Sequence, residues 1–466
     1  MNFLSRLVIP ESTEHLALLR YLLVVVSILI VTYSSIALIA STASAVLDSY
    51  GRRKGHGTFS RFARDLADLA APGPGVVISL AVIPLITIIL AYTQLFSGTD
   101  IGIPLFLTAA AVFYFTGFYF LVSYKKSFHL DSIYNAYGKL AGSHRNEIDS
   151  NVADDFEAFG RKAASARMRA GRRAAILLWI ATWIFVGSVR YAFHPSGWAS
   201  SEFVTILLSG GTFVSLLNYL VSALLIASAS VLFFFFKWEK GIAISADEEY
   251  RSFVKRLVLP VGLVAVALEP VLIFFDIRSL PQTGISSATF GLAGVSLLLA
   301  FILLHLFYSM IKESDVNVGH YIFVGVILMV VIWAAKDEIA LSYATRNHDQ
   351  VLGQRYETML AELNPETAAP VVSGEDIYSG RCSACHRFDI RLVGPPYNQT
   401  LPNFVGKMDS LEDFIMNPRQ VVAGYPPMPN QGLKPAEVKA VAEYIMGVYL
   451  KSHPQAAGKD TTKAKI

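Results

Sequence analysis

Two cysteines and a histidine stand close together toward the C-terminal end of the chain, in the stretch Arg381-Cys382-Ser383-Ala384-Cys385-His386. Cys-x-x-Cys-His is the attachment signature for c-type haem. Thiols three positions apart reach two vinyl groups on one porphyrin edge, and the adjacent imidazole points at the iron. Cys382 and Cys385 are the only cysteines in the sequence, so no disulfide competes for them. A zinc site, the alternative for such a motif, needs two more ligands, and the segment offers no Cys/His partner pair.

The flanking residues predict the elements that position this motif. Residues 373–380 indicate a short amphipathic helix leading into it, and Gly394-Pro395-Pro396 forms a rigid turn that presents a proline carbonyl to the histidine's free N–H. Further on, Gly424-Tyr425-Pro426-Pro427-Met428-Pro429 places one methionine on a proline-stiffened loop. A thioether opposite an imidazole is the His/Met ligation of electron-carrying cytochromes c. A last helix is predicted to begin at Lys434-Pro435-Ala436-Glu437, with apolar residues at helical spacing: Val438, Val441, Tyr444 and Ile445.

Residues 374–452 thus resemble a class I cytochrome c. The resemblance implies one covalently bound haem c, with Cys382 and Cys385 as its thioether donors. It makes His386 the proximal iron ligand and Met428 the distal one. Met408 and Met416 compete for the distal role, but they lie in the run 407–418, which is predicted to be an ordinary helix. Such a domain moves one electron at a time, and no catalytic residue is implied.

The composition excludes a protein that is soluble throughout. The chain has 466 residues, of which 53% are hydrophobic and 16% charged, and its mean hydropathy is +0.47. The apolar residues form about eight runs, each long enough to cross the roughly 30 Å of hydrocarbon in a bilayer. These runs are 17–44, 74–96, 102–124, 173–194, 210–236, 256–276, 285–311 and 318–340. The predicted fold is all-α: an eight-span membrane bundle followed by the cytochrome c domain.

Lysine and arginine crowd into the loops after the first, third and fifth spans, whereas the alternate loops 97–101, 195–209 and 277–284 hold only Arg278. Basic loops face the cytoplasm. The N-terminus is therefore predicted outside, and an even number of spans returns the C-terminus to that side, where c-type haem is attached. This arrangement predicts a multi-pass protein of the bacterial inner membrane with its cytochrome c domain in the periplasm. Ala43-Ser44-Ala45 looks like a signal-peptidase site, but the basic residues follow the apolar run, so an uncleaved first span is predicted.

The remaining segments complete the predicted domain organisation. Residues 1–16 are expected to form an interfacial segment with a helix cap, and residues 17–340 the bundle. The mixed-charge loop 125–172 is expected to form one or two solvated cytoplasmic helices. Residues 341–373 are expected to be a linker, and residues 453–466 a disordered tail. No phosphate loop or nucleotide fingerprint occurs, so no nucleic-acid partner is expected.

Polar residues within the predicted spans indicate where the bundle itself has a task. His15 and Arg20 lie near the outer end of span one, and Arg190 and His194 share a face near the outer end of span four. A b-type haem held by His15 and His194 is one hypothesis, and interfacial or hydrogen-bonded histidines are the alternative. Glu269 in span six is expected to pair with Arg190 or to relay protons. His305 and His320 lie near the inner ends of spans seven and eight.

The N-terminal 240 residues are also similar to subunit I of cytochrome bd oxidases. The similarity rests on Phe3-Leu4-Ser5-Arg6-Leu7 leading to His15, on Gly102-Ile103-Pro104-Leu105 and on Gly197-Trp198. Two departures from the family concern its haem ligands. Thr108 and Thr116 stand where the family has two glutamates, and Asn218 where it has a ligating histidine. An oxygen-reducing di-haem site is therefore not expected, and His15 is the only family ligand that remains.

These observations predict an electron-transfer subunit of a respiratory or photosynthetic membrane complex. Its expected partners are membrane lipid, other subunits of the complex, and cytochromes or redox proteins of the periplasm. One alternative is a quinol:cytochrome c oxidoreductase with a b haem and a quinone site near Glu269. The other is a membrane anchor that holds a mobile cytochrome c domain near its partner.

Overall fold

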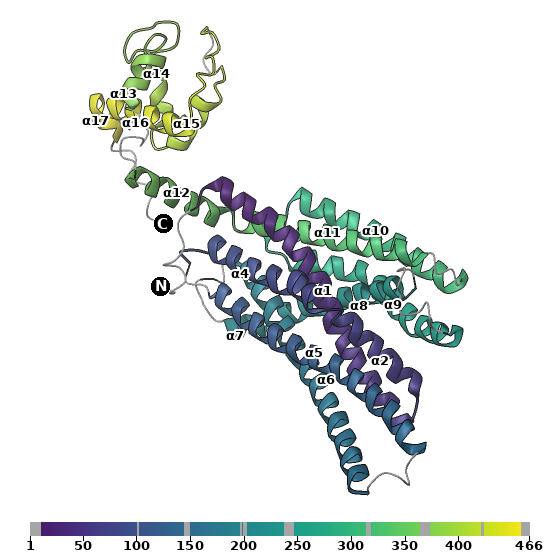
Figure 1. Ribbon diagram of the computed structural model, residues 1–466. Helices are drawn as coiled ribbons and strands as arrows, with labels where there is room; N and C mark the ends of the chain where they lie inside the picture. Colours follow the sequence, from purple (N-terminus) through teal and green to yellow (C-terminus); the bar gives the residue numbers. More distant parts are fainter. Residues whose placement is uncertain are drawn as a thin grey trace. The chain divides into compact units, whose positions relative to one another are not determined.

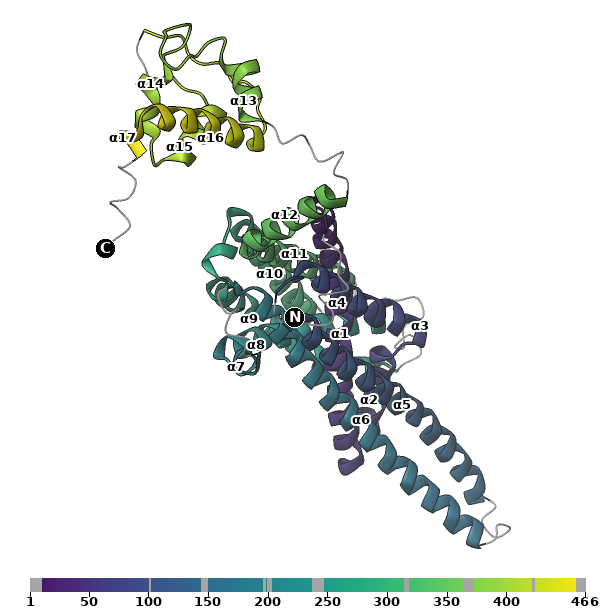
Figure 2. The same cartoon turned by 90° about the vertical axis from the view of Figure 1, so that its left-hand side faces the viewer.

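The computed structural model describes residues 11–99, 102–143, 150–195, 198, 203–236, 247–313, 318–363, 373–420 and 424–457. Within these residues every regular element is helical, as predicted (Figures 1 and 2). The chain divides into two compact units, Met1–Tyr356 and Glu357–Ile466. The first contains the apolar helices and the second contains the Cys-x-x-Cys-His motif.

Seven described helical segments of the first unit are long and apolar enough to cross a membrane. They are Thr13–Lys54, Pro74–Leu95, Ile103–Gly138, Asp154–Ala192, Gly210–Phe236, Glu248–Ser279 and Ser287–Lys312. The corresponding helices are α1 (Thr13–Lys54), α3 (Pro74–Val77) continued by a π-helical turn (Ile78–Val82) and α4 (Ile83–Leu95), α5 (Ile103–Ser143), α6 (Ser150–Ala192), α8 (Gly210–Phe236), α9 (Glu248–Ser279) and α10 (Ser287–Glu313). The shorter helices are α2 (Gly57–Ala70), α7 (Phe203–Leu207) and a 3-10 turn (Gln282–Gly284).

The eighth predicted span, 318–340, is not among these seven segments. It lies in α11 (Gly319–Ala344), whose apolar stretch is interrupted by Lys336, Asp337 and Glu338 in succession. In α11 the 17 residues from Gly319 to Ala335 precede this charged group, and this length is the lower limit for crossing a bilayer. Nevertheless α11 packs against α1, α8 and α10, so it belongs to the same bundle.

The first helix runs through the middle of the bundle and contacts α2, α4, α6, α8 and α11 (Figure 1). Its buried face is rich in small residues, which let neighbouring helices approach closely. These residues are Ser34, Ser35, Ala37, Ala40, Ser41 and Ser44. Side chains complete the contacts: the Ser34 hydroxyl lies 2.7 Å from the Tyr219 hydroxyl of α8, and Tyr33 Oη donates to the Ala70 carbonyl oxygen at 2.8 Å. This central position explains why small residues stand among the larger apolar ones on the buried face of α1.

The segments outside the predicted spans differ from expectation in detail. The loop 125–172 is largely a continuation of α5 and α6, which pack side by side and extend beyond the other helices (Figures 1 and 2). Residues 341–373 are not simply a linker, because α11 extends to Ala344 and α12 occupies Arg346–Leu363. Ser12 caps α1, accepting from the His15 backbone N–H at 3.2 Å. Residues 1–10 of the interfacial segment lie outside the described part of the chain. So do residues 458–466 of the expected tail, which begins with α17 (Pro454–Ala457).

The second unit is a small helical domain around one apolar core. Its elements are α13 (Gly374–Ile377), a π-helical turn (Tyr378–Cys382), α14 (Tyr397–Thr400), a 3-10 turn (Leu401–Phe404), α15 (Met408–Met416), α16 (Pro435–Ser452) and α17. The predicted last helix is confirmed: α16 begins at Pro435, and Val438, Val441 and Ile445 are buried. It crosses α13 closely, since a Cβ at Gly374 would lie 2.1 Å from the Ala440 carbonyl oxygen. The crossing fixes the helix that leads into the cysteine motif.

Candidate functional site

The His386 side chain is held in one orientation by its surroundings. Its Nδ1 lies 3.0 Å from the Pro395 carbonyl oxygen, and its ring stacks on Tyr397 with centroids 5.1 Å apart and planes 10° apart. The turn itself is closed by Gly394 N–H, which donates to the Cys385 carbonyl oxygen at 2.8 Å. An Nδ1–H donating to a carbonyl fixes the tautomer and leaves the lone pair on Nε2, the nitrogen that ligates a metal in such arrangements.

Gly394 is required by this close packing. A Cβ at this position would lie 2.3 Å from His386 Cε1 and 2.7 Å from its Nδ1. The predicted Gly-Pro-Pro turn therefore has two functions: Pro395 supplies the acceptor, and Gly394 makes room for the imidazole.

Both cysteines are free thiols at the end of the helix that precedes the histidine. Cys382 is buried and Cys385 is half-buried. The motif is one continuous turn, because the backbone N–H groups of Cys385 and His386 donate to the Cys382 carbonyl oxygen at 3.1 and 2.9 Å. Burial raises the pKa of the Cys382 thiol, against the opposing effect of a hydrogen bond from Tyr397. The raised pKa favours the neutral thiol of Cys382 near pH 7, which suits this sulfur to addition rather than to metal binding as a thiolate.

An aromatic cluster that the sequence reasoning missed encloses the motif. Tyr378, Phe388 and Tyr397 have ring centroids 5.4 to 6.2 Å from one another, and Tyr378 Oη donates to the His386 carbonyl oxygen at 3.4 Å. The position of Tyr397, directly after the Gly-Pro-Pro turn, was the available signal. These rings shield one side of the motif from water.

Met428 lies on the loop between α15 and α16, and it is half-buried. Hydrogen bonds secure the loop on both sides of it. Gln420 Nε2 donates to the Tyr425 carbonyl oxygen at 2.8 Å, and Asn430 Nδ2 donates to the Met416 carbonyl oxygen at 3.1 Å. Arg381, next to the first cysteine, donates to the Gln431 carbonyl oxygen at 3.0 Å. This last bond ties the methionine loop directly to the cysteine motif.

The two competing methionines lie at the ends of α15, which confirms the helix predicted there. Met408 and Met416 both pack against the apolar core of the domain. Their side chains are thus already part of the domain's packing, whereas Met428 belongs to a loop without a helical face to bury.

The donor set fits a c-type haem. Two free thiols three residues apart, an imidazole oriented through Nδ1, a glycine that admits the ring and a secured methionine loop are the parts such a group requires. A metal site of another kind finds no support: among the described residues no group of three His, Cys, Asp or Glu side chains is arranged to hold a metal ion.

The histidines proposed for a b haem occupy different surroundings. His15 is exposed at the start of α1, where its Nδ1 lies 2.9 Å from Glu11. His194 is half-buried, its Nδ1 lies 3.0 Å from the Arg190 carbonyl oxygen, and it lines a cavity to which His15 does not contribute. His305 is exposed, and the ring of His320 lies against Tyr321 with the two planes tilted by 40°. The structure therefore does not bring His15 and His194 together as a ligand pair.

One further expectation for the bundle is corrected. Glu269 does not pair with Arg190: its Oε1 accepts from Ser222 at 3.1 Å, and Arg190 donates to Ser215 at 3.1 Å. Arg20, at the outer end of span one, has partners on two other helices. It donates to Glu338 of α11 and to Asp349 of α12, both at 2.7 Å, so it joins three helices. In each case a partner far away in sequence decided the contact.

Comparisons with known proteins concern the second unit alone. The family model described as cytochrome c matches residues 371–448. The cytochrome c-551 of Azotobacter vinelandii is 31% identical over 78 residues, which are 16% of this chain and 95% of that protein. The cytochrome c-552 of Hydrogenobacter thermophilus is 31% identical over 70 residues, which are 14% of this chain and 71% of that protein. The cytochrome c-551 of Stutzerimonas stutzeri is 32% identical over 79 residues, which are 16% of this chain and 76% of that protein. No solved structure matches. None of these matches supports the similarity to subunit I of cytochrome bd oxidases.

Proposed function

Since this chain belongs to the cytochrome c family through its C-terminal domain, we propose that it is a membrane-embedded electron carrier with a single haem c. Electron transfer through covalently bound haem follows from the family. The observation that carries the proposal is the joint geometry of two free thiols and an imidazole held by Pro395. The bound haem supplies one-electron redox chemistry at its iron.

Each residue of the site has a distinct proposed role. Cys382 and Cys385 form the two thioether bonds, and His386 and Met428 ligate the iron through Nε2 and the thioether sulfur. The support for Met428 over Met408 and Met416 is the fixed loop on which it lies and the core packing of the other two. Tyr378, Phe388 and Tyr397 exclude water from the proximal side, which keeps the local dielectric constant low around the iron.

We propose that α11 is the eighth span, which places both ends of the bundle on one side of the membrane. Support comes from the partners of its charged residues: Lys336 pairs with Asp276 and Asp337, and Glu338 with Arg20. Charges within a span are tolerated when they face the bundle interior and are paired. The basic loops after α1, α5 and α8 then lie in the cytoplasm of a bacterial inner membrane, and α12 leads to a cytochrome c domain in the periplasm.

The bundle is larger than a membrane anchor requires, and we propose that it docks against other subunits of a respiratory or photosynthetic complex. Large apolar side chains are exposed along α9 and α10, where lipid or a neighbouring subunit can cover them. They include Val261, Val264, Leu268, Val271, Phe274, Phe275, Leu298, Phe301 and Ile302. Periplasmic redox proteins would exchange electrons with the cytochrome c domain.

A pyridine haemochrome spectrum of the purified chain tests the core of the proposal, because it separates c-type from b-type haem. One c haem and no b haem per chain is expected. A b haem would revive the oxidoreductase hypothesis and direct attention to His194. Reporter fusions at the C-terminus and in the 125–172 segment test the topology. The first fusion should report a periplasmic location and the second a cytoplasmic one. A cytoplasmic location of both fusions would refute the eight-span arrangement.

A further inference from the structure

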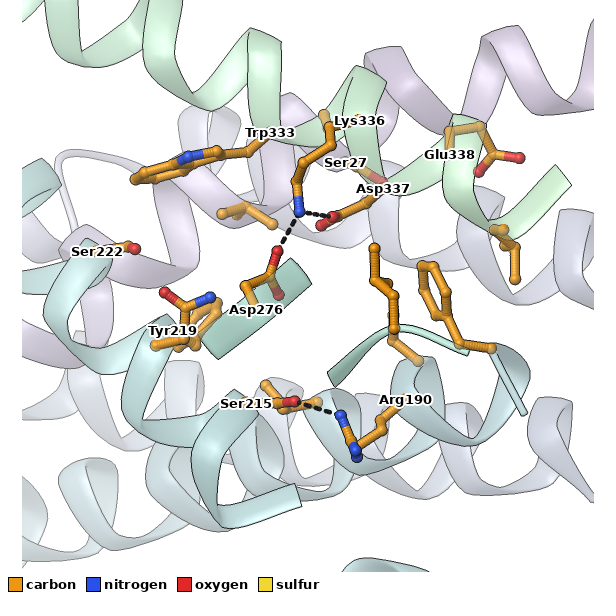
Figure 3. A pocket seen from close by; sticks show the side chains of 18 of the residues that line it. Ser27, Arg190, Ser215, Tyr219, Ser222, Asp276, Trp333, Lys336, Asp337 and Glu338 are labelled. Carbon is orange, nitrogen blue, oxygen red and sulfur yellow. Dashed lines mark hydrogen bonds and ion pairs between the residues drawn. The ribbon is translucent and has the colours of Figure 1, made fainter. Parts of the chain in front are cut away.

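A cavity of about 230 Å³ lies inside the membrane bundle (Figure 3). Its walls come from the N-terminal parts of α1, α8 and α10 and from the C-terminal parts of α4, α6, α9 and α11. All of these parts lie at the end of the bundle where α11 leads into α12. The cavity is thus on the side of the membrane that the proposed topology gives to the cytochrome c domain.

Two polar atoms in the cavity wall are buried without a partner in the described structure. Glu269 of α9 is 1% exposed; its Oε1 accepts from Ser222, but its Oε2 has no hydrogen-bond partner. The hydroxyl of Ser296, on α10 and also 1% exposed, has none either. A buried acceptor without a donor destabilises a protein, because its hydrogen bonds to water are lost and not replaced. Two such atoms on neighbouring helices around one cavity indicate a ligand that supplies the missing hydrogen bonds.

The rest of the polar wall carries both cationic and anionic side chains. Figure 3 shows Lys336 and Asp337 on one side, Arg190 with Ser215 on the facing side, and Asp276 between them. The two cations disfavour a cationic ligand, and the carboxylates disfavour an anionic one. A neutral ligand that both donates and accepts hydrogen bonds fits this wall.

The remaining wall is apolar and rich in aromatic rings. It includes Tyr92, Phe185, Phe193, Tyr219 and Trp333, with Leu23, Ile88 and Val330 between them. Rings of this kind stack on a planar ligand. The volume is slightly below the roughly 300 Å³ at which ligand pockets usually begin, so it admits one substituted ring rather than a whole lipid.

We propose that this cavity binds the ring of a membrane quinol. One ring hydroxyl donates to Glu269 Oε2, the Ser296 hydroxyl donates to a ring oxygen, and Arg190 donates to the oxygen at the opposite end of the ring. The apolar tail leaves between the helices toward the lipid. A quinol is a neutral, planar, lipid-soluble molecule with a hydroxyl at each end, which matches every part of the wall.

If the proposed function holds, a quinol in this site can supply electrons to haem c. Only this electron transfer rests on the proposed function; the binding of the quinol does not. Oxidation of one quinol to the quinone breaks two O–H bonds and releases two protons and two electrons. The Glu269 carboxylate accepts the first proton and water the second. A haem c held by Cys382, Cys385, His386 and Met428 would accept these two electrons one at a time, and a redox partner would take up the first before the second arrives.

Binding of a short-chain ubiquinone and a short-chain menaquinone to the full chain in mild detergent tests the site itself, by calorimetry. Saturable binding at one site per chain is expected, and Glu269→Gln should weaken it roughly tenfold because the hydrogen bond to Oε2 is lost. Ser296→Ala should weaken it roughly threefold. Asp68→Asn is the matched control, since this carboxylate lies in the bundle, pairs with Lys125 at 3.3 Å and does not line the cavity.

Ala293→Leu fills the cavity without removing a polar group and should also reduce binding, with a thermal unfolding scan to show that the bundle remains folded. Unchanged binding in all three cavity variants, or displacement of the bound quinone only by phospholipid or detergent, would overturn the proposed site. Reduction of haem c by added quinol is measured separately. Binding without haem reduction would refute the electron path while the site stands, and absence of haem c with intact binding would refute the proposed function alone.

Discussion

The His386 imidazole and the Pro395 carbonyl are joined by a hydrogen bond of 3.0 Å, and Gly394 provides the space in which the imidazole lies. The bond does two things at once. It fixes which ring nitrogen carries the proton, and it raises the electron density on the other nitrogen, which strengthens that nitrogen as a metal ligand. Two consecutive residues, Gly394 and Pro395, thus control one side of the proposed haem site.

Gly394→Ala should displace the imidazole, because the new methyl group would come within 2.3 Å of His386 Cε1. Overpacking of this kind destabilises a domain by about 1 to 3 kcal/mol. A changed reduction potential and a lower yield of correctly ligated cytochrome are expected, measured by potentiometry and absorption spectroscopy. Gly380→Ala is the control, since a Cβ there meets no atom within 4 Å. Equal potentials in the two variants would show that the turn does not orient the ligand.

Met428→Ala should remove the sulfur-to-iron charge-transfer band at the red end of the visible spectrum while the haem stays covalently attached. Met408→Ala and Met416→Ala should keep the band but lower the thermal stability of the domain, because these side chains pack against its core. Loss of the band in either of these two variants, with the band intact in Met428→Ala, would move the distal ligand to α15.

Cys382→Ala should weaken or abolish covalent attachment of haem, measured by haem staining after denaturing electrophoresis. The buried position of Cys382 makes it the more sensitive of the two cysteines, since its side chain is also part of the domain core. Cys385→Ala, at the half-buried position, leaves the core intact and serves as the comparison. Full staining in both variants would contradict the proposed attachment.

The candidate haem site could be predicted from the sequence because its chemistry lies in short segments: the motif, the Gly-Pro-Pro turn, the methionine loop and the last helix. The bundle was predictable only as a set of apolar helices. Which way Glu269 and Arg190 face depends on the rotation of two helices, so their expected pairing was wrong and the cavity between them could not be foreseen. The contact of Arg20 with Glu338 joins residues 318 positions apart. The polar segment 341–373 is predicted to be a linker because few residues of its helix α12 are buried, namely Leu352 and Gly353, while Arg20 bonds Asp349 of that helix.

Arg20→Gln should loosen α12 from the bundle. Arg20 and Glu338 have side chains only 12% and 13% exposed, and Arg20 also bonds Asp349 and Thr345. Removal of one partner from a buried ion pair typically destabilises by about 3 to 5 kcal/mol, because a buried charge is left unpaired. Faster hydrogen exchange in residues 346–363 is expected by mass spectrometry. The double variant Arg20→Gln/Glu338→Gln should recover part of the protection, and additive losses would show that the two residues act independently.

The stability of the α12 contact should fall as pH decreases from 7 to 5.5, through His348. Its Nε2 lies 3.1 Å from the Leu95 carbonyl oxygen, and its ring packs on Phe96 and Trp198. Burial lowers the pKa of His348, with Arg355 and Arg20 in the same direction and with Asp349 and the Leu95 carbonyl opposing. As pH falls, His348 is therefore protonated first in the unfolded chain, where its pKa is the ordinary value of about 6.5. The stability that neutral His348 contributes is complete above that pH and is lost as pH falls toward the lower pKa of the folded state.

His348→Gln isolates this effect from other groups. Burial also raises the pKa of Asp349, but that carboxylate is present in both proteins, so its contribution is common to the two curves. Thermal unfolding midpoints in detergent should fall more steeply for the natural chain than for the variant between pH 7 and 5.5. Parallel curves would mean that His348 remains equally protonated in the folded and unfolded states. A steeper fall only in the natural chain would identify this imidazole as the group that links α12 docking to the pH of the compartment it faces.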